Sequence, residues 1–248
     1  MCIFLRDCSI YINKMRFFRF KQFQITDDRS AMKVGTDSVI LGAWVGVNAV
    51  KHILDIGCGS GLLALLLAQR ISTAKIVGVE IDEGACLDAE FNFINSKWNE
   101  RLSVIHADIL SVSIKQKYDL IISNPPFFKS SLLPNEKNRA GARHDESLSL
   151  DRLLLFLKSH LADEGRFALV FPFNREDELL LLASNNGLYP QRILHTKNKP
   201  GAQTKRSFIE FSKFENMQPQ INVLEIRNEN SEYSTDYKEL TKDFYLNF

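Results

Sequence analysis

One apolar segment of the sequence ends in Asn124, two prolines and Phe127. Proline lacks a backbone N–H and its ring fixes φ, so this corner is stiff and leaves nearby carbonyl groups free to accept hydrogen bonds. An exocyclic amine is a poor nucleophile because its lone pair is delocalised. The Asn124 side-chain oxygen and the Pro125 carbonyl can accept its two protons, which exposes the lone pair to an electrophilic methyl group. Phe127, which follows Pro126 in the sequence, can stack on the flat substrate. The alternative is that this segment is only a rigid loop in which Asn124 forms a turn.

A glycine-rich loop follows another short apolar segment, with the spacing G-x-G-x-G. Glycine lets the backbone turn sharply and lets a ligand approach closely. The dinucleotide fingerprint is G-x-G-x-x-G, and here an acid, Asp55, also precedes the loop. That acid would disfavour a pyrophosphate and would suit a cationic amine, such as that of a bound amino acid. The alternative is a strand-to-helix turn without a ligand; we expect a cofactor site that includes Asp55, Gly57, Cys58, Gly59 and Gly61.

Three further acids follow the ends of expected strands. Glu80 ends an apolar segment, where a carboxylate can accept both ribose hydroxyls of a nucleoside, as it does in nicotinamide enzymes. It therefore indicates a nucleoside without saying which cofactor. Asp82 either shares in that contact or caps the next helix, and the sequence leaves both open. Asp108 is either a loop aspartate or an acceptor for an adenine amino group, and the other motifs favour the ligand.

Strands and helices must alternate along the chain to position these residues. Near-continuous apolar strands between helices favour a mostly parallel sheet covered on both faces, an α/β doubly wound fold. Ligands bind such sheets outside the carboxyl ends of the strands, where the glycine loop, Glu80, Asp108 and Asn124 all lie. We expect seven strands, at 53–56, 76–80, 102–105, 118–122, 166–171, 191–195 and 207–211, and helices at 62–70, 83–95, 150–161 and 175–186.

The composition fits a globular protein of one large domain. Of 248 residues, 45% are hydrophobic and 25% charged, which is ordinary for a soluble protein. No apolar run approaches the roughly 20 residues that span a bilayer, and no secretory signal is visible, so we expect a cytoplasmic protein. We expect residues 1–14 to be a disordered or mis-annotated extension, and 15–248 to be one domain with an N-terminal extension at 15–50.

The cysteines and the net charge argue against two classes of protein: one held by disulfides or a metal ion, and a strongly basic protein dedicated to binding nucleic acid. None of the four cysteines forms a CxxC pair and the five histidines are scattered, so we expect no disulfide framework and no metal site. Residues 214–248 hold seven acids and three bases, net −4, which leaves +5 on the remainder of a chain whose net charge is +1. This mild bias permits RNA binding through a local patch without proving it, and it leaves the role of the acidic tail open.

Together the four motifs resemble those of class I S-adenosylmethionine-dependent methyltransferases, and the Asn-Pro-Pro-Phe sequence is similar to that of members acting on amino nitrogens. Residues 18–23, 32–44, 142–144 and 240–245 are similar to signatures of the bacterial tRNA1(Val) adenine-N6 methyltransferases. The resemblance implies a seven-stranded methyltransferase sheet and methylation of the adenine beside the anticodon of a valine tRNA. It also implies that S-adenosylmethionine is held by Gly57, Gly59, Gly61, Glu80 and Asp108, and the target base by residues 124–127.

Further contacts are expected around these two sites. Residues 33–44 would form a helix packed over the cofactor, with Lys33 and Asp37 as its polar contacts; the alternative is an ordinary core or surface helix. The phosphates of an RNA attract basic side chains. The alternative is that the basic residues near the site lie on solvated loops and bind nothing. We expect RNA contacts from Phe128, Lys129, Arg139 and Arg143, and from Lys197, Lys199 and Lys205, on a monomer.

Other functions stay open at this point. Glutamine N5-methylation of a release factor also uses an Asn-Pro-Pro loop, but Phe127 stands where that family usually has Tyr. We also expect this protein to lack the helical N-terminal domain that such enzymes carry. Guanine-N2 methylation of ribosomal RNA is a second methyltransferase alternative. A nicotinamide-dependent oxidoreductase and a non-enzymatic nucleoside-binding or RNA-chaperone module belong to different classes.

Overall fold

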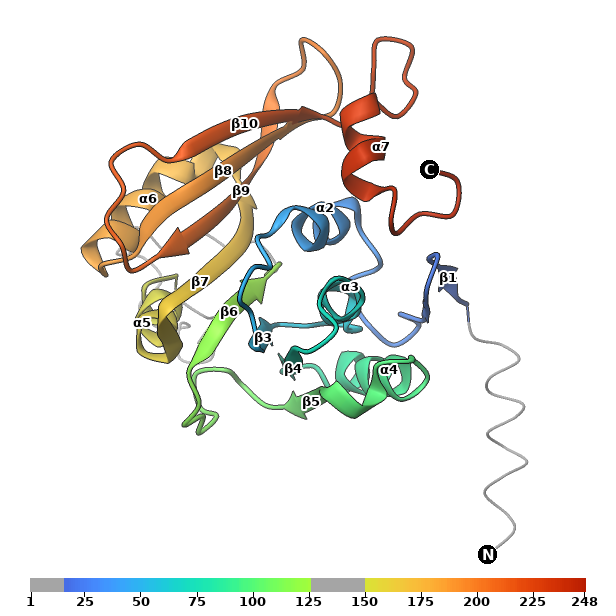
Figure 1. Ribbon diagram of the computed structural model, residues 1–248, viewed down its shortest axis with the longest axis vertical. Coiled ribbons are helices and arrows are strands. Elements are labelled where there is room, and N and C mark those ends of the chain that lie inside the picture. The colour runs from blue at the N-terminus through green and yellow to red at the C-terminus, as the bar shows by residue number, and fades with distance from the viewer. Residues whose placement is uncertain (1–15, 126–149) are drawn as a thin grey trace, which may run out of the picture.

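Eight strands form one sheet in the computed structural model, which describes residues 16–125 and 150–248 (Figure 1). Their order is β10-β8-β9-β7-β6-β3-β4-β5, and β3 to β7 run parallel while β9 runs antiparallel to both β7 and β8. The strands are β3 (His52–Ile56), β4 (Lys75–Glu80), β5 (Leu102–His106), β6 (Tyr118–Ser123), β7 (Leu161–Pro172), β8 (Tyr189–Lys197), β9 (Thr204–Ser212) and β10 (Gln220–Glu225).

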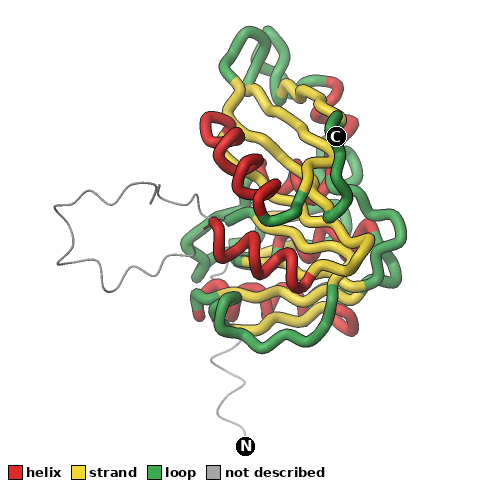
Figure 2. Tube along the Cα trace, turned by 90° about the vertical axis from the view of Figure 1, so that its left-hand side faces the viewer, coloured by secondary structure: helices red, strands yellow, loops and turns green. Residues whose placement is uncertain are grey.

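Helices cover both faces of this sheet (Figures 1 and 2). Successive side chains of a strand point to opposite faces, so Leu120 and Ile122 join one buried cluster and Ile121 joins the other. The first cluster lies under α2 (Thr36–Trp44), α3 (Leu62–Arg70), α4 (Glu83–Ile94) and α7 (Thr235–Thr241), and the second under α5 (Leu150–His160) and α6 (Glu176–Asn185). Short 3-10 helices η1 (Asn99–Arg101) and η2 (Phe173–Arg175) precede β5 and α6.

The predicted α/β fold with a mostly parallel sheet is confirmed, but the expected number of strands is wrong. The additional strand is β10, which pairs in parallel with β8 at one edge of the sheet. Its side chains Ile221 and Val223 are exposed and only Leu224 is buried. An edge strand with so little burial lacks the continuous apolar run by which the other strands are predicted.

The acidic segment 214–248 is part of the folded domain. Besides β10 it supplies α7, which packs against α2, and a C-terminal stretch that meets the N-terminal hairpin of β1 (Phe18–Arg19) and β2 (Gln24–Ile25). Tyr245 stacks on Phe20 at 5.7 Å, and the Lys21 ammonium donates to the Phe248 carbonyl. Along the described residues, none of the helices has the length and apolarity that a membrane-spanning segment needs.

Candidate active site

Strand register brings three of the predicted site residues to one edge of the sheet. Ile56 of β3 lies opposite Val79 of β4 and Ser123 of β6. One residue further along, Gly57, Glu80 and Asn124 therefore stand level at the carboxyl ends of three adjacent parallel strands. Neighbouring strands are about 4.8 Å apart, so these groups lie within reach of one small ligand.

The glycine loop requires glycine for two different reasons. Gly57 and Gly59 have φ of +64° and +56°, in the left-handed region that disfavours other residues, with open space where a Cβ would lie. Gly61 has φ of +85° and begins α3, and a Cβ there would stand 2.4 Å from the Phe93 ring. The loop therefore both turns sharply and packs closely on α4.

Glu80 holds this loop in place. Its Oε2 accepts from the Gly59 N–H at 2.8 Å, and its Oε1 accepts from Ile81 at 2.8 Å and Asp82 at 2.9 Å. The residue is only 8% exposed. Each carboxylate oxygen is thus fixed by backbone donors, and Oε2, which accepts only one of them, has lone-pair capacity left for a ligand hydroxyl.

Asp55 lies beneath the loop and does not line the cavity described below. Its carboxyl group is fully buried, with Oδ2 accepting from the Ala64 N–H of α3 at 3.2 Å. Its Oδ1 has no hydrogen-bond partner among the described residues. Burial, reinforced by the charge of Glu80, raises the pKa of Asp55 to about 8. Burial likewise raises the pKa of the adjacent Cys58 thiol, with the charge of Asp55 second.

The stability of the fold should fall with rising pH because of Asp55. Its pKa rises from 3.8 to about 8 on folding, so between these values the folded protein binds more protons than the unfolded chain. This contribution is complete below about pH 4 and is lost as pH approaches 8. In Asp55→Asn, an isosteric neutral variant, we expect thermal unfolding midpoints at pH 5, 6, 7 and 8 to fall less steeply than in wild type. Identical slopes in the two proteins would contradict this account.

Asn124 is oriented by a residue that sequence reasoning missed. Its Nδ2 donates to the Ser38 hydroxyl of α2 at 2.8 Å, which fixes the amide plane and leaves Oδ1 as an acceptor. Ser38 lies in the segment expected to cover the cofactor, one position after Asp37, but nothing in its own residue type marks it. Pro125 follows as a buried residue.

Removing the Ser38 hydroxyl should slow turnover without weakening the binding of the amine acceptor. One neutral hydrogen bond contributes about 1 kcal/mol, so we expect Ser38→Ala to lower kcat about fivefold. Steady-state kinetics would show the loss in kcat with KM for the acceptor unchanged, and Ser38→Thr, which keeps the hydroxyl, should recover most of it. A kcat equal to wild type in Ser38→Ala would show that Asn124 needs no such support.

A small open cavity of about 50 Å³ lies between the glycine loop and α2. Lys33 is at its wall, but Asp37 is not, because its carboxylate pairs with Arg206 of β9 at 3.0 Å. The lining residues are Met32, Lys33, Val34, Ser38, Gly57, Cys58, Gly59, Ser60, Leu62, Leu63 and Asn124.

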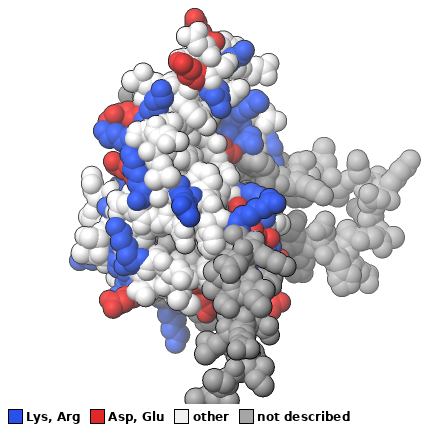
Figure 3. All heavy atoms as spheres, turned by 90° about the vertical axis from the view of Figure 1, so that its right-hand side faces the viewer, with Lys and Arg blue, Asp and Glu red and all other residues white. Residues whose placement is uncertain are grey.

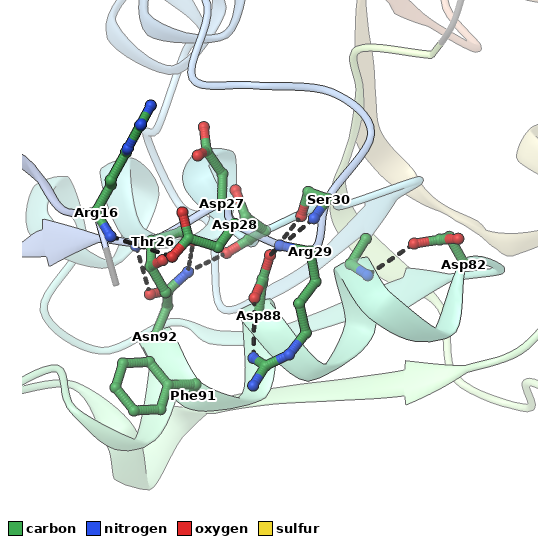
Figure 4. Close-up of polar contacts among 12 residues, drawn as sticks. Arg16, Thr26, Asp27, Asp28, Arg29, Ser30, Asp82, Asp88, Phe91 and Asn92 are labelled. Atoms are coloured by element: carbon green, nitrogen blue, oxygen red, sulfur yellow. Dashed lines mark hydrogen bonds and ion pairs between the residues drawn. The ribbon is translucent and has the colours of Figure 1, made fainter. Parts of the chain in front are cut away.

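A strap of residues 26–34 forms one wall of this cavity and is bound to α4 (Figure 4). The Asn92 amide exchanges hydrogen bonds with the Thr26 backbone at 2.9 and 2.8 Å and also donates to the Ser60 carbonyl at 2.9 Å. The buried Asp88 carboxylate accepts from the N–H groups of Arg29 and Ser30 at 2.8 and 2.9 Å. Asn92 thereby joins the strap directly to the glycine loop.

The structure assigns contacts to the two remaining acids. Asp82 caps α4, with Oδ1 accepting from the Ala85 N–H at 2.8 Å, so the helix-cap alternative is confirmed for its present contacts. His106 lies opposite Glu80 at the end of β5, which puts Asp108 on the same edge. Asp108 is exposed, and its Oδ1 accepts from the Leu110 N–H at 2.9 Å.

Part of the expected RNA surface also reaches this edge. Lys197 ends β8 and lies opposite Thr204 at the start of β9, and Lys199 and Lys205 are in or beside the loop that joins these strands. On the face that carries β1, α4 and α7, basic side chains are scattered among uncharged ones (Figure 3). Pro126, Phe127, Phe128, Lys129, Arg139 and Arg143 lie outside the described residues.

Comparison with known proteins gives the chain close relatives. Residues 30–174 match the family model for the methyltransferase small domain. A tRNA1(Val) (adenine(37)-N6)-methyltransferase of Bacteroides thetaiotaomicron is 43% identical over 231 residues, which cover 93% of this chain and 97% of that protein. An enzyme of the same name from Trichodesmium erythraeum is 44% identical over 235 residues, covering 93% and 98%.

Solved structures agree with the fold. An O-methyltransferase predicted in Agrobacterium tumefaciens superposes with a TM-score of 0.63 at 15% identity, covering 84% of this chain and 96% of that chain. A geranyl diphosphate methyltransferase bound to sinefungin superposes with a TM-score of 0.52 at 13% identity, covering 71% and 76%. At these identities the likeness concerns the fold alone.

Proposed function

The chain belongs to the tRNA1(Val) (adenine(37)-N6)-methyltransferase family, and from this premise we propose that it transfers a methyl group from S-adenosylmethionine to N6 of the adenine beside the anticodon of a valine tRNA. The observation that carries the proposal is the level alignment of Gly57, Glu80 and Asn124 on adjacent strands. It supports a cofactor and an amine acceptor placed side by side, as a direct transfer between them requires.

The residues around the cavity fit this cofactor. The fixed Glu80 carboxylate has acceptor capacity left at Oε2 for a ribose hydroxyl, and the glycine loop lets a ligand approach the backbone. Asp108, exposed on the same edge, would accept from the adenine amino group, and Lys33 lies at the cavity wall. Asp55 would support the glycine loop indirectly, through its hydrogen bond to α3. Asp37 would contribute indirectly as well, because its ion pair with Arg206 joins α2 to β9. When bound, S-adenosylmethionine supplies a methyl group on a sulfonium sulfur, and loss of that methyl group leaves a neutral thioether.

The chain's own contribution is then positioning and localisation of a lone pair. The Asn124 side-chain oxygen and the Pro125 carbonyl would accept hydrogen bonds from the two N6 protons, which draws the nitrogen towards tetrahedral geometry; once the methyl group is bound, one of these protons leaves to solvent. Ser38 holds the Asn124 amide in the orientation that this role needs. The target adenine must leave its stack at a cost of a few kcal/mol, which stacking on Phe127 and Phe128 would offset by roughly 1–3 kcal/mol per base.

Nucleoside mass spectrometry of tRNA tests the function directly. A strain lacking this protein should lose N6-methyladenosine from its valine tRNA, regain it with the wild-type gene, and fail to regain it with Asn124→Ala. Retention of the modified nucleoside in the deletion strain would refute the proposal. Calorimetric titration with S-adenosylmethionine and with NAD would, in addition, separate a methyltransferase from the oxidoreductase alternative.

A further inference from the structure

An exposed aromatic side chain stands at the rim of the same sheet edge, beyond Asn124. Phe173 begins η2 directly after β7 and is 38% exposed. Ser123 of β6 lies opposite Leu169 of β7, so Asn124 is level with Val170 and Phe173 lies three residues further out. At about 3.3 Å per residue this is roughly 10 Å. That distance is too long for the base held at Asn124 and suits a neighbouring nucleotide.

The Phe173 ring is held from one side by a polar pair. Its edge-on partner is His195 of β8, at 4.9 Å between ring centroids and 81° between planes. The His195 Nε2 lies 2.8 Å from the Glu176 Oε2 at the start of α6, and the two side chains are only 16% and 13% exposed. Three separate elements thus fix the base of an aromatic ring that keeps more than a third of its surface in solvent.

Three lysines lie on the strand ends and the loop at the same edge as this ring, while the first turn of α6 beside it carries Glu176, Asp177 and Glu178. Pro172 lies opposite Arg206 in the β7–β9 pair, so Lys205 is level with Phe173. Lys197 ends β8, and Lys199 follows it in the loop to β9. Within residues 16–125 and 150–248, no acidic side chain pairs with these three lysines. An aromatic platform beside cations is the arrangement that binds unpaired nucleotides, through base stacking and phosphate contacts.

We propose that Phe173, supported by His195 and Glu176, is a stacking platform for a nucleotide next to the methylated adenine. Lys197, Lys199 and Lys205 contact the adjoining phosphates. This inference rests on the proposed function, because it needs an RNA whose target base reaches Asn124. It adds a second RNA-binding point, on η2, β8 and α6, that is separate from the pocket for the target base.

The test is the kinetics of Phe173→Ala on a valine tRNA transcript. Loss of a base stack weakens RNA binding, so KM for the tRNA should rise about 10-fold or more, while kcat at saturating RNA and the Kd for S-adenosylmethionine stay within about twofold of wild type. Phe173→Trp should bind as wild type does. Phe214→Ala is the matched control, because Phe214 is 59% exposed but follows β9 at the opposite edge of the sheet.

A fluorescent base gives a readout that a merely structural role would not move. Anticodon stem-loops with 2-aminopurine on either side of the target adenine should be quenched in one position by wild-type protein and not by Phe173→Ala. If wild type methylates the tRNA while Phe173→Ala matches it in KM and in quenching, the platform is wrong and the methyltransferase function stands. If wild type methylates no tRNA, the proposed function and the platform fail together.

Discussion

Replacement of Asn124 by alanine should lower kcat by about 10²–10³-fold, the loss typical of removing one preorganised group that acts on the reacting centre. The variant loses the amide oxygen that would accept an N6 proton, and Pro125 alone cannot hold both protons. Cofactor affinity should stay within about twofold, because the cavity is bounded mainly by the glycine loop and the strap. Single-turnover rates with saturating tRNA, together with calorimetric titration of S-adenosylmethionine, measure the two effects separately.

Two further variants sharpen this test. Asn185→Ala removes an exposed asparagine of α6, far from the edge that carries Asn124, and should turn over as wild type does. Asn124→Asp keeps acceptor oxygens and can accept from the Ser38 hydroxyl, but its carboxylate no longer has the N–H group that now fixes the amide, so it should fall between wild type and Asn124→Ala. A single-turnover rate in Asn124→Ala within threefold of wild type would remove the residue from the chemistry.

The sheet edge could be predicted from sequence because it follows from strand order. Gly57, Glu80 and Asn124 each come directly after an apolar run, and the carboxyl ends of parallel strands meet at one edge. The structure keeps that juxtaposition. Asp82 shows the limit of the same reasoning, because a residue two positions past a strand can serve either a ligand or the next helix, and its contacts are those of a cap.

The strap could not be predicted because its partners are remote in sequence. Asp88 and Asn92 stand four residues apart on α4, on a face that also buries Ala89 and Phe93. Two buried polar residues there must be hydrogen-bonded, so the sequence predicts that they have partners but does not indicate which residues these are. The partner lies 58–66 positions earlier, in a segment whose polar residues read as an ordinary loop. Ser38 was missed for the same reason, since its role depends on Asn124, 86 positions later.

Substitution of Glu80 by glutamine should be the most damaging change to cofactor binding. The carboxylate accepts three backbone N–H groups, two at Oε1 and one at Oε2. Glutamine has nearly the same shape but one acceptor oxygen, so in either orientation its NH2 group faces a backbone donor in a site that is 8% exposed. An unsatisfied buried donor costs about 1–3 kcal/mol, and the Gly59 loop or the start of α4 must shift to relieve it. A ribose hydroxyl also loses a charged acceptor, worth about 1.5–3 kcal/mol.

The loss of the charged acceptor predicts that the Kd for S-adenosylmethionine rises by about 10- to 100-fold in Glu80→Gln, since each 1.4 kcal/mol is a factor of ten. Calorimetric titration well below the unfolding midpoint measures this without interference from lower stability. Glu83→Gln is the matched control, because Glu83 is exposed in the first turn of α4 and bonds no part of the loop; its Kd should equal that of wild type. An unchanged Kd in Glu80→Gln would mean that the ribose is bound elsewhere, and the level alignment of Gly57, Glu80 and Asn124 would then no longer support the placement of cofactor beside acceptor.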